Sequence, residues 1–486
     1  MTVSTALPAS TSQSLPGPVY AAIAPLMALA MALASPAVFN DADSFWHLAA
    51  GQWIVAHGAV PTTDVFSFSA PREVWHAHEW LTEILFAGVF RLFGWSGLAA
   101  LSGLAVAGAL TLVARRALRH GLSGLPLLAV MLLSLSLIAP SLLVRPHLFG
   151  LLLLAFWTDR LLAAREADTA PPLWLAAIML LWVNMHASFL LGLALIGPFA
   201  LEALIEAPSE RRFKVFRDWA LFGALAVLAG LANPQGFHAF VYPVYVMNMK
   251  MLASIIEWRP TDFSQTGPME IALLALIGLP MLRPVRVEPM RLLILLGLVH
   301  MALHQGRQQM VFAIVAPLLL AAPLAQAFVS RDETSPGRDR KIWAGALALA
   351  ALMVGARLSL PIQRVDGPTA PLSALAAVPQ DLRDKPVLNE LGFGGLLIYQ
   401  GVKPFIDGRT DMYGDPFWFR YERMLAGDAA TFEAGLEKYG FRWTLLPPDA
   451  PLNKVLATRP GWRRIYSDAF AVAYAKDEAE SSVTHR

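Results

Sequence analysis

The sequence contains no cysteine and few charged residues. The absence of cysteine excludes a disulfide framework, and it fits a chain of which a large part lies outside the reducing cytosol. Asp, Glu, Lys and Arg make up 15% of the 486 residues, whereas 56% are hydrophobic. This is more apolar side chain than a soluble core of that length can bury. The composition therefore excludes a soluble globular protein and predicts a multi-pass membrane protein.

Short strands of alternating polarity are absent from the apolar part of the chain, which excludes a transmembrane barrel. Apolar runs of about membrane length recur between Val19 and Leu360, and such runs cross lipid as helices. Lys and Arg occur in small clusters between these runs, not in one broad stripe, and the net charge is only +2. Membrane lipids are therefore expected partners, and nucleic acids are not.

Residues 2–18 contain no Lys or Arg. A cleaved signal peptide needs a basic segment before its apolar run. We therefore expect the first apolar run to be a retained membrane span.

Eleven membrane-spanning helices are predicted from the apolar runs. They lie at residues 19–39, 97–114, 124–140, 147–164, 173–185, 188–205, 217–232, 269–283, 291–304, 308–328 and 342–360. With a cytoplasmic N-terminus, every basic cluster falls in a cytoplasmic loop, as the distribution of Lys and Arg in membrane proteins requires. These clusters are Arg115, Arg116 and Arg119; Arg160 and Arg165; Arg211, Arg212, Lys214 and Arg217; Arg283, Arg286 and Arg291; and Arg331, Arg338, Arg340 and Lys341.

The apolar stretch at 79–93 is too short to cross a membrane comfortably. If it did cross, every later basic cluster would move to the other side. We therefore expect a helix lying at the outer interface, followed by a turn at residues 94–97 into the second span.

The hydropathy drops at Pro361, and residues of both charges and turn-forming residues follow. The predicted organisation is a transmembrane domain at 1–360, with a large first outer loop at 40–96, and a soluble extracytoplasmic α/β domain at 361–486. Strands are predicted at 387–389, 396–399, 404–407, 443–446 and 469–474, and helices at 415–425 and 431–439. The fold class is an α-helical polytopic membrane protein with a small C-terminal α/β domain, located in the bacterial inner membrane.

Two carboxylates, Asp41 and Asp43, directly follow the first span, and His47 comes four residues later. A carboxylate in an apolar surrounding can take the proton of an attacking hydroxyl group. The same three residues could instead hold a divalent metal ion, so the cofactor stays undefined. A structural alternative is that Asp41 caps a helix that begins near Ser44.

Glu79, in the motif formed by residues 76–80, is the second acidic candidate and is treated as catalytic together with Asp41 and Asp43. Its structural alternative is a negative charge that favours the N-terminus of the interfacial helix. The tryptophans around these acids, Trp46 and Trp75 among them, fit an interfacial aromatic belt as well as a platform for a sugar.

Polar residues gather at the predicted outer ends of the spans, where they could line one substrate-binding pocket. They are His47, His78, Arg145, His147, Asn184, His186, Asn233, Gln235 and Arg307. Arg145 and Arg307 are isolated cations, and a guanidinium group suits a lipid phosphate. The alternatives are ion pairs inside the bundle for the arginines and helix caps for the asparagines.

Asp407, Arg409 and Asp411 follow the strand predicted at 404–407. One interpretation is a turn held by hydrogen bonds between aspartate and arginine. The other is that the C-terminal domain folds over the outer pocket, where these residues contact an acceptor.

The order of these features resembles the GT-C superfamily of polytopic glycosyltransferases. Members have an acidic motif in the first outer loop and an interfacial helix after it. The matching segments are residues 41–61, which begin with Asp41-Ala-Asp43, and the interfacial stretch that ends at Gly94. A bacterial branch of this superfamily is indicated by five further motifs, at residues 78–81, 145–146, 184–186, 233–236 and 405–411.

This resemblance implies a catalytic pocket on the outer face, a sugar donor linked to polyprenyl phosphate, and inversion at the anomeric carbon. It assigns the activation of the acceptor to Asp41 or Asp43. No sequon-recognition motif is evident, so a lipid, glycan or cell-envelope acceptor is favoured over a protein. The alternatives are a transporter or flippase, for which an internal repeat is missing, and a non-enzymatic envelope protein.

Overall fold

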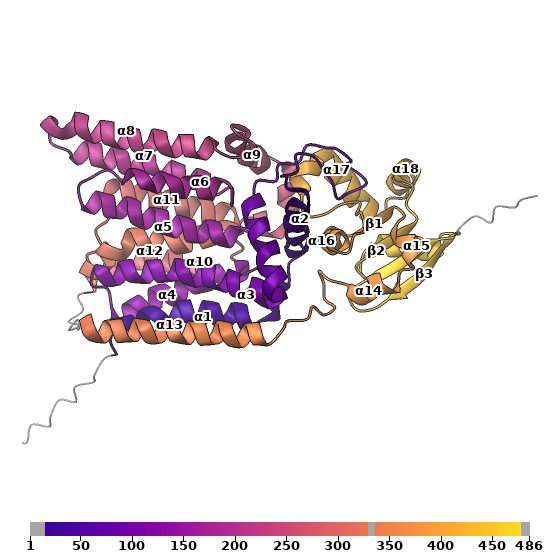
Figure 1. Cartoon of the computed structure of the whole chain (residues 1–486), viewed down its shortest axis with the longest axis horizontal. Coiled ribbons are helices and arrows are strands. Elements are labelled where there is room, and N and C mark those ends of the chain that lie inside the picture. Colours follow the sequence, from indigo (N-terminus) through magenta and orange to yellow (C-terminus); the bar gives the residue numbers. More distant parts are fainter. Residues whose placement is uncertain (1–14, 329–335, 478–486) are drawn as a thin grey trace, which may run out of the picture.

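A long bundle of helices and a small α/β domain at one end of it make up the protein (Figure 1). The computed structural model describes residues 15–328 and 336–477. Two parts of the sequence lie outside the described residues, namely residues 1–14 and Arg331. Both bear on the prediction of a cytoplasmic N-terminus. We call the end of the bundle that carries the α/β domain the domain end.

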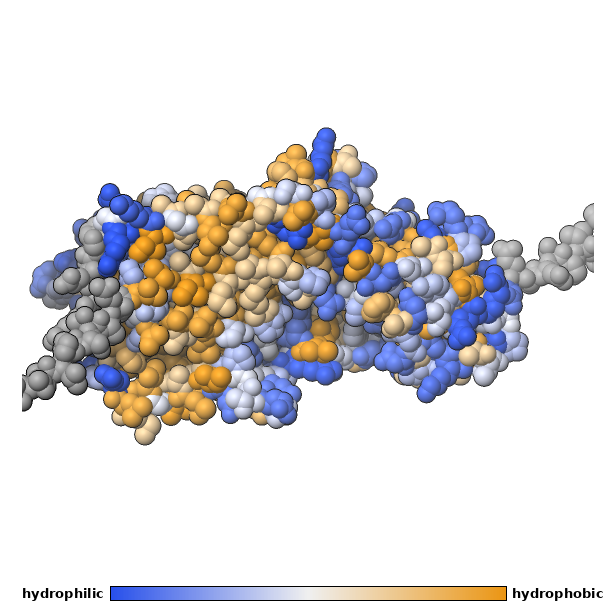
Figure 2. All heavy atoms as spheres, turned by 90° about the horizontal axis from the view of Figure 1, so that it is seen from below, coloured by the Kyte–Doolittle hydropathy of each residue, from blue (hydrophilic) through white to orange (hydrophobic). Residues whose placement is uncertain are grey.

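Each of the eleven predicted spans coincides with at least part of a helix. These helices are α1 (Gly17–Ala34), α3 (Trp80–Arg119), α4 (Gly124–Ile138), α5 (His147–Glu166), α6 (Ala176–Val183), α7 (Phe189–Glu206), α8 (Ser209–Leu231), α10 (Pro268–Leu282), α11 (Pro289–His304), α12 (Gln309–Ala327) and α13 (Pro336–Ser359). Among the described residues, seven helices are long and apolar enough to cross a membrane, and three shorter apolar helices accompany them. Hydrophobic side chains gather over the bundle and hydrophilic ones over the α/β domain (Figure 2). The prediction of a polytopic helical membrane protein is confirmed.

Two helical segments lie across the domain end of the bundle, α2 (Asp43–His57) and the first part of α3 (Figure 1). The chain between these two segments has little regular structure. Within α3 the backbone turns at Gly94, which has φ 56° and ψ −150°. Glycine is suited to this position because a positive φ costs it little. The turn predicted between the stretch at 79–93 and the second span is therefore present.

Buried ion pairs join the helices at the end of the bundle opposite the α/β domain. Arg116 of α3 pairs with Asp159 of α5 at 3.1 Å. Glu202 of α7 pairs with Arg165 at 3.2 Å and with Arg291 of α11 at 2.9 Å. Because these residues come from four different helices, the pairs fix the packing of one helix against the next.

Replacing Glu202 with alanine is expected to destabilise the protein. In this variant Arg165 and Arg291 lose the carboxylate that they share. Breaking a buried ion pair costs about 3–5 kcal/mol. The thermal unfolding midpoint in detergent measures the effect. Glu206→Ala is the matched control, since the Glu206 side chain is 54% exposed. Equal unfolding midpoints for the two variants would contradict the expectation.

The α/β domain contains a four-stranded sheet with the strand order β1-β2-β4-β3. Its strands are β1 (Val387–Asn389), β2 (Trp443–Leu446), β3 (Trp462–Ser467) and β4 (Val472–Lys476). β1 is parallel to β2, and the other pairs are antiparallel. The helices are α14 (Leu372–Ala377), α15 (Gln380–Arg383), α16 (Leu391–Tyr399), α17 (Thr410–Leu425), α18 (Ala429–Tyr439) and α19 (Leu452–Thr458).

Three details of the predicted secondary structure are wrong. The segment at 396–399 belongs to helix α16, because a short, fully buried apolar run has no periodicity that separates strand from helix. The segment at 404–407 is not a strand: the amide of Phe405 donates to the Asn389 side chain, which itself donates to the carbonyl of Ile406, both at 2.8 Å. Strand β3 was not predicted, because its exposed arginines obscure the strand pattern.

Helix α16 places the α/β domain directly against α2. A Cβ atom on Gly395 would overlap the carbonyl oxygen of Ala42, so glycine permits this close approach. Ala42 lies between the two acidic residues of the first loop. The domain therefore covers the segment for which the sequence predicts catalysis.

Candidate active site

Asp41 and Asp43 lie at the start of α2 and are nearly buried, with exposed fractions of 8% and 9%. The hydroxyl group of Ser44 donates to Asp41 at 3.3 Å and also reaches the carbonyl of Val144 at 3.0 Å. The indole nitrogen of Trp46 donates to Asp43 at 2.9 Å. These bonds orient both carboxylates toward the segment that precedes α5.

Arg145 occupies the space in front of the two aspartates. Its guanidinium group pairs with Asp43 and lies 3.6 Å from Asp41. On its other side it pairs with Glu257 at 2.9 Å, and Glu257 also lies 3.4 Å from Arg307. We call these five residues the arginine–carboxylate cluster. Arg145 and Arg307, predicted as separate cations, thus share one carboxylate that the sequence analysis did not single out.

Charge balance in this cluster favours one bound proton near neutral pH. Three carboxylates face two guanidinium groups, so full ionisation leaves one negative charge in excess. Burial raises the pKa of Asp43 to about 7, against the opposing charge of Arg145, and it raises the pKa of Asp41 as well. Burial would also raise the pKa of Glu257, but Arg145 and Arg307 outweigh it and lower that pKa to about 2. The proton therefore belongs to the aspartate pair, which titrates as a unit.

Glu79 lies beside a second group of polar side chains, which we call the histidine–glutamate cluster. Three imidazoles surround its carboxylate, those of His186 at 3.5 Å, His47 at 3.7 Å and His78 at 3.9 Å. His47 also contacts Glu83 at 3.1 Å, the fifth member of the cluster. Burial raises the pKa of Glu79 and lowers the pKa of His47 and His186 well below their ordinary range. The imidazoles of His47 and His186 are therefore neutral and act as hydrogen-bonding groups.

Across residues 15–328 and 336–477, no group of three or more His, Asp or Glu side chains has an arrangement that could hold a metal ion. The ligand set considered from the sequence, formed by Asp41, Asp43 and His47, does not converge, because His47 turns toward Glu79 and Glu83 while the aspartates face Arg145. The arrangement fits charge stabilisation by arginine better than metal coordination.

Several predicted binding residues hold the surrounding backbone. His147 donates to the carbonyl of Ser141 at 2.8 Å. Asn184 donates to the carbonyls of Leu180 and Ala232 and accepts from the indole of Trp80. These bonds place the two residues beside the site as supports for its loops.

Asn233 and Gln235 lie in a turn before α9 (His238–Met247). The Asn233 side chain accepts from the amide of Gln235 at 2.8 Å and donates to the carbonyl of Gly230 at 2.8 Å. The contacts of Asn233 match the capping alternative.

Asp407 and Arg409 belong to a buried ion-pair contact between the α/β domain and the first loop. Two nitrogens of Arg409 lie 2.7 Å from Asp407, and a third lies 2.7 Å from Asp64 of the first loop. The guanidinium group also stacks over Trp75 at 4.8 Å. Asp407 and Arg409 are 0% and 1% exposed. Their contacts correspond to the turn held by aspartate–arginine hydrogen bonds, extended by a partner that is distant in sequence.

Gly408, in the same turn, packs directly against Asp43, one of the catalytic candidates. A Cβ atom at this position would overlap the carboxylate of Asp43 and approach the indole nitrogen of Trp46 to 2.7 Å. The α/β domain therefore touches Asp43 through backbone. The sequence offered one signal for this contact, a glycine between two charged residues, but no spacing rule connects residues 43 and 408.

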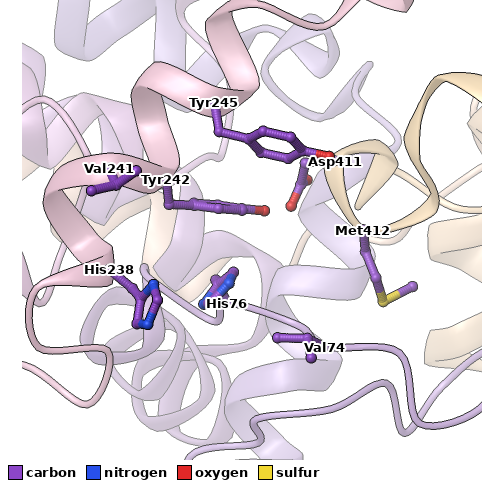
Figure 3. Close-up of a pocket in the computed structure, with 8 residues that line it drawn as sticks. All are labelled: Val74, His76, His238, Val241, Tyr242, Tyr245, Asp411 and Met412. Atoms are coloured by element: carbon purple, nitrogen blue, oxygen red, sulfur yellow. The ribbon is translucent and has the colours of Figure 1, made fainter.

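A pocket of about 320 Å³ opens beside α9 (Figure 3). The ring of His78, a member of the histidine–glutamate cluster, lies 5.8 Å from the ring of Tyr242 in its lining. Asp411 lies at its edge, on the first turn of α17, and burial raises the pKa of this residue. Tyr242 and Tyr245 extend into the pocket from α9 toward Asp411. Neither tyrosine was predicted as a binding residue, because aromatic residues near a predicted membrane surface are common.

No protein-family model and no curated protein matches this sequence. The structure is similar to crystal structures of the oligosaccharyltransferase of Archaeoglobus fulgidus. One is tethered by a disulfide bond to an acceptor peptide that contains the NVT sequon, with a TM-score of 0.53, 11% identity and coverage of 95% of this chain and 74% of that chain. The apo form gives a TM-score of 0.50 and 12% identity, and covers 96% of this chain and 75% of that chain. At this identity the similarity shows the fold alone, and the predicted resemblance is confirmed in its GT-C-type fold.

Proposed function

We propose that this protein is a glycosyltransferase that moves a sugar from a polyprenyl-phosphate carrier to an extracytoplasmic acceptor. The observation that carries the proposal is the arginine–carboxylate cluster, which combines paired acids and paired guanidinium groups within a GT-C-type fold. The proposed location is the bacterial inner membrane. The N-terminus is then cytoplasmic, and the α/β domain lies on the extracytoplasmic side.

In the proposed reaction, an acceptor hydroxyl oxygen attacks the anomeric carbon of the donor. The new glycosidic bond forms as the bond from that carbon to the phosphate oxygen breaks, and polyprenyl phosphate leaves. The hydroxyl proton passes to the ionised carboxylate of the Asp41–Asp43 pair. Attack opposite to the leaving group inverts the configuration at the anomeric carbon.

Arg145 and Arg307 offset the negative charge that develops on the departing phosphate. Both guanidinium groups already face one anion, the carboxylate of Glu257, at 2.9 Å and 3.4 Å. Trp258 stacks under Arg307 at 4.3 Å and holds that guanidinium group in place. A phosphate group that enters the cluster therefore meets two oriented cations and competes with Glu257 for them.

Donor consumption tests the proposal. The purified protein in lipid nanodiscs is incubated with a panel of polyprenyl-phosphate sugars and with extracts of cell-envelope glycans and lipids as acceptors. Release of polyprenyl phosphate, followed by mass spectrometry, is the expected result. If no donor of the panel is consumed with any acceptor fraction, the enzymatic assignment fails.

Replacing Glu257 with glutamine is expected to strengthen the binding of polyprenyl phosphate. The variant removes the carboxylate charge that competes with phosphate for Arg145 and Arg307, so we expect affinity to rise by up to about tenfold. Binding in nanodiscs by native mass spectrometry measures it. Glu288→Gln, an exposed acid near Arg291 at the opposite end of the bundle, is the control. Unchanged or weaker binding by a folded Glu257→Gln variant would argue against a phosphate site here.

A further inference from the structure

The pocket in Figure 3 is built from three segments that are far apart in the sequence. Helix α9 contributes His238, Tyr242 and Tyr245, the first loop contributes His76, and the first turn of α17 contributes Asp411. The ring of His76 lies 4.5 Å from that of Tyr242 and 6.1 Å from that of His238. Aromatic rings therefore form one side of the pocket, and a carboxylate faces them.

The described side chains of the pocket offer a phosphate group no lysine or arginine to bind. Its described lining includes Asp411 but neither lysine nor arginine. An anionic group placed there would meet a like charge without a compensating cation. The phosphate of a donor instead has Arg145 and Arg307 available in the neighbouring cluster.

A neutral ligand with many hydroxyl groups and an apolar ring face fits these walls. The ring of Tyr245 belongs to a residue that is 55% exposed, so an aromatic surface is open to a ligand. Asp411 can accept hydrogen bonds from hydroxyl groups. Burial lowers the pKa of His76, so its neutral imidazole can both donate and accept. The volume of about 320 Å³ lies at the lower end for ligand pockets.

His78 lies between the pocket and Glu79 of the histidine–glutamate cluster. The His78 ring lies 5.8 Å from that of Tyr242, and its nitrogen lies 3.9 Å from the carboxylate of Glu79. Burial raises the pKa of Glu79, and the charges of Arg145 and Arg307 oppose this rise. Glu79 therefore lies within electrostatic reach of the arginine–carboxylate cluster as well as beside His78.

We propose that this pocket binds a sugar ring of the acceptor, stacked on Tyr242 and Tyr245 and hydrogen-bonded to Asp411, so that the acceptor is a glycan. This inference rests on the proposed transferase function. The donor phosphate then binds to Arg145 and Arg307, and the acceptor ring binds on the other side of Glu79. The two substrates approach the acids from opposite sides.

Glycan binding tests this assignment without turnover. Saturation-transfer difference NMR on the protein in nanodiscs is performed with neutral tri- to pentasaccharides prepared from cell-envelope glycans and with the same glycans carrying a phosphate. We expect the neutral forms to bind more tightly than the phosphorylated ones. Tyr242→Ala and Asp411→Asn should each weaken binding by about tenfold or more, as expected for a ligand-stacking aromatic and a half-buried hydrogen-bonding acid.

Two controls separate a sugar site from a membrane anchor. Phe237 is 68% exposed and precedes α9, but it does not line the pocket, so Phe237→Ala should leave glycan binding unchanged. Asp262→Asn replaces an exposed acid of the loop between α9 and α10 and should also have no effect. Equal losses for Phe237→Ala and Tyr242→Ala would identify an interfacial aromatic belt and overturn the proposal.

The remaining outcomes distinguish this inference from the transferase function. If the protein consumes a polyprenyl-phosphate sugar but binds none of the glycans, the transferase function stands and the glycan pocket is wrong. If the phosphorylated glycans bind more tightly, and Asp411→Asn strengthens their binding further, the pocket is an anion site and the proposal is overturned. If glycans bind through Tyr242 and Asp411 while no donor is consumed, the pocket is a glycan site but the transferase function, and with it the acceptor role, fails.

Discussion

Replacing Asp43 with asparagine is expected to reduce sugar transfer by at least about 100-fold, the effect of losing a general base. The substitution keeps the size of the side chain and its capacity to accept from Trp46, so the start of α2 should stay intact. It also leaves Arg145 with two other carboxylates, those of Asp41 and Glu257. Polyprenyl phosphate release per minute, measured alongside the wild-type protein, gives the result.

Asp41→Asn, measured in parallel, shows which member of the pair accepts the proton. A loss in only one variant assigns the base to that residue, whereas similar losses in both indicate that the pair acts as a unit. Asp262→Asn serves as the control for an exposed acid of an outer loop. Full activity of both the Asp41→Asn and Asp43→Asn variants would remove the general-base mechanism.

The pH dependence of the wild-type rate follows from the same carboxylates. The base works only when ionised, and burial raises the pKa of Asp43 to about 7. If Asp43 is the base, the rate should therefore rise with pH through about 7 and level off above it. A rate that does not change between about pH 5 and about pH 8 would show that Asp43 does not supply the base.

Replacing Arg409 with methionine is expected to be the most destabilising single substitution in the α/β domain. Asp407 and Asp64 would lose the cation between them, and both carboxylates are fully buried. Removing one partner of such a pair costs about 3–5 kcal/mol. We expect a lower unfolding midpoint and faster proteolysis of the first loop, because the contact that joins the loop to the domain is lost.

The matched control for this variant is Arg459→Met. Arg459 pairs with Glu433 within the same domain, but the two side chains are 27% and 50% exposed. An exposed pair contributes only about 0–1 kcal/mol. If the Arg409→Met and Arg459→Met variants unfold at the same temperature, the buried ion-pair contact of Arg409 does not hold the domain in place. Retained glycosyl transfer by an Arg409→Met variant with a released domain would show that the domain is not required for chemistry.

The bundle could be predicted from the sequence because its rule is local. In lipid the backbone N–H and C=O groups can form hydrogen bonds only with one another, so each apolar run of sufficient length becomes a helix. The kink at Gly94 was predictable for the same kind of reason, since the stretch before it is too short to cross. Asp41, Asp43 and Arg145 were identified because charged residues near apolar runs are rare.

Glu257, Gly408 and Asp64 could not be found this way, because their roles depend on segments that only the folded chain brings together. Glu257 pairs with two arginines that lie more than 40 residues before and after it in the sequence. Gly408 contacts Asp43 only because the α/β domain packs against α2. The interpretation of Arg409 changed for the same reason: its local pair with Asp407 follows from spacing, but Asp64 does not. Hydrophobic patterning thus determined which segments form the helices of the bundle. The composition of the site was determined by packing at the domain end, because charges are buried there against partners distant in sequence.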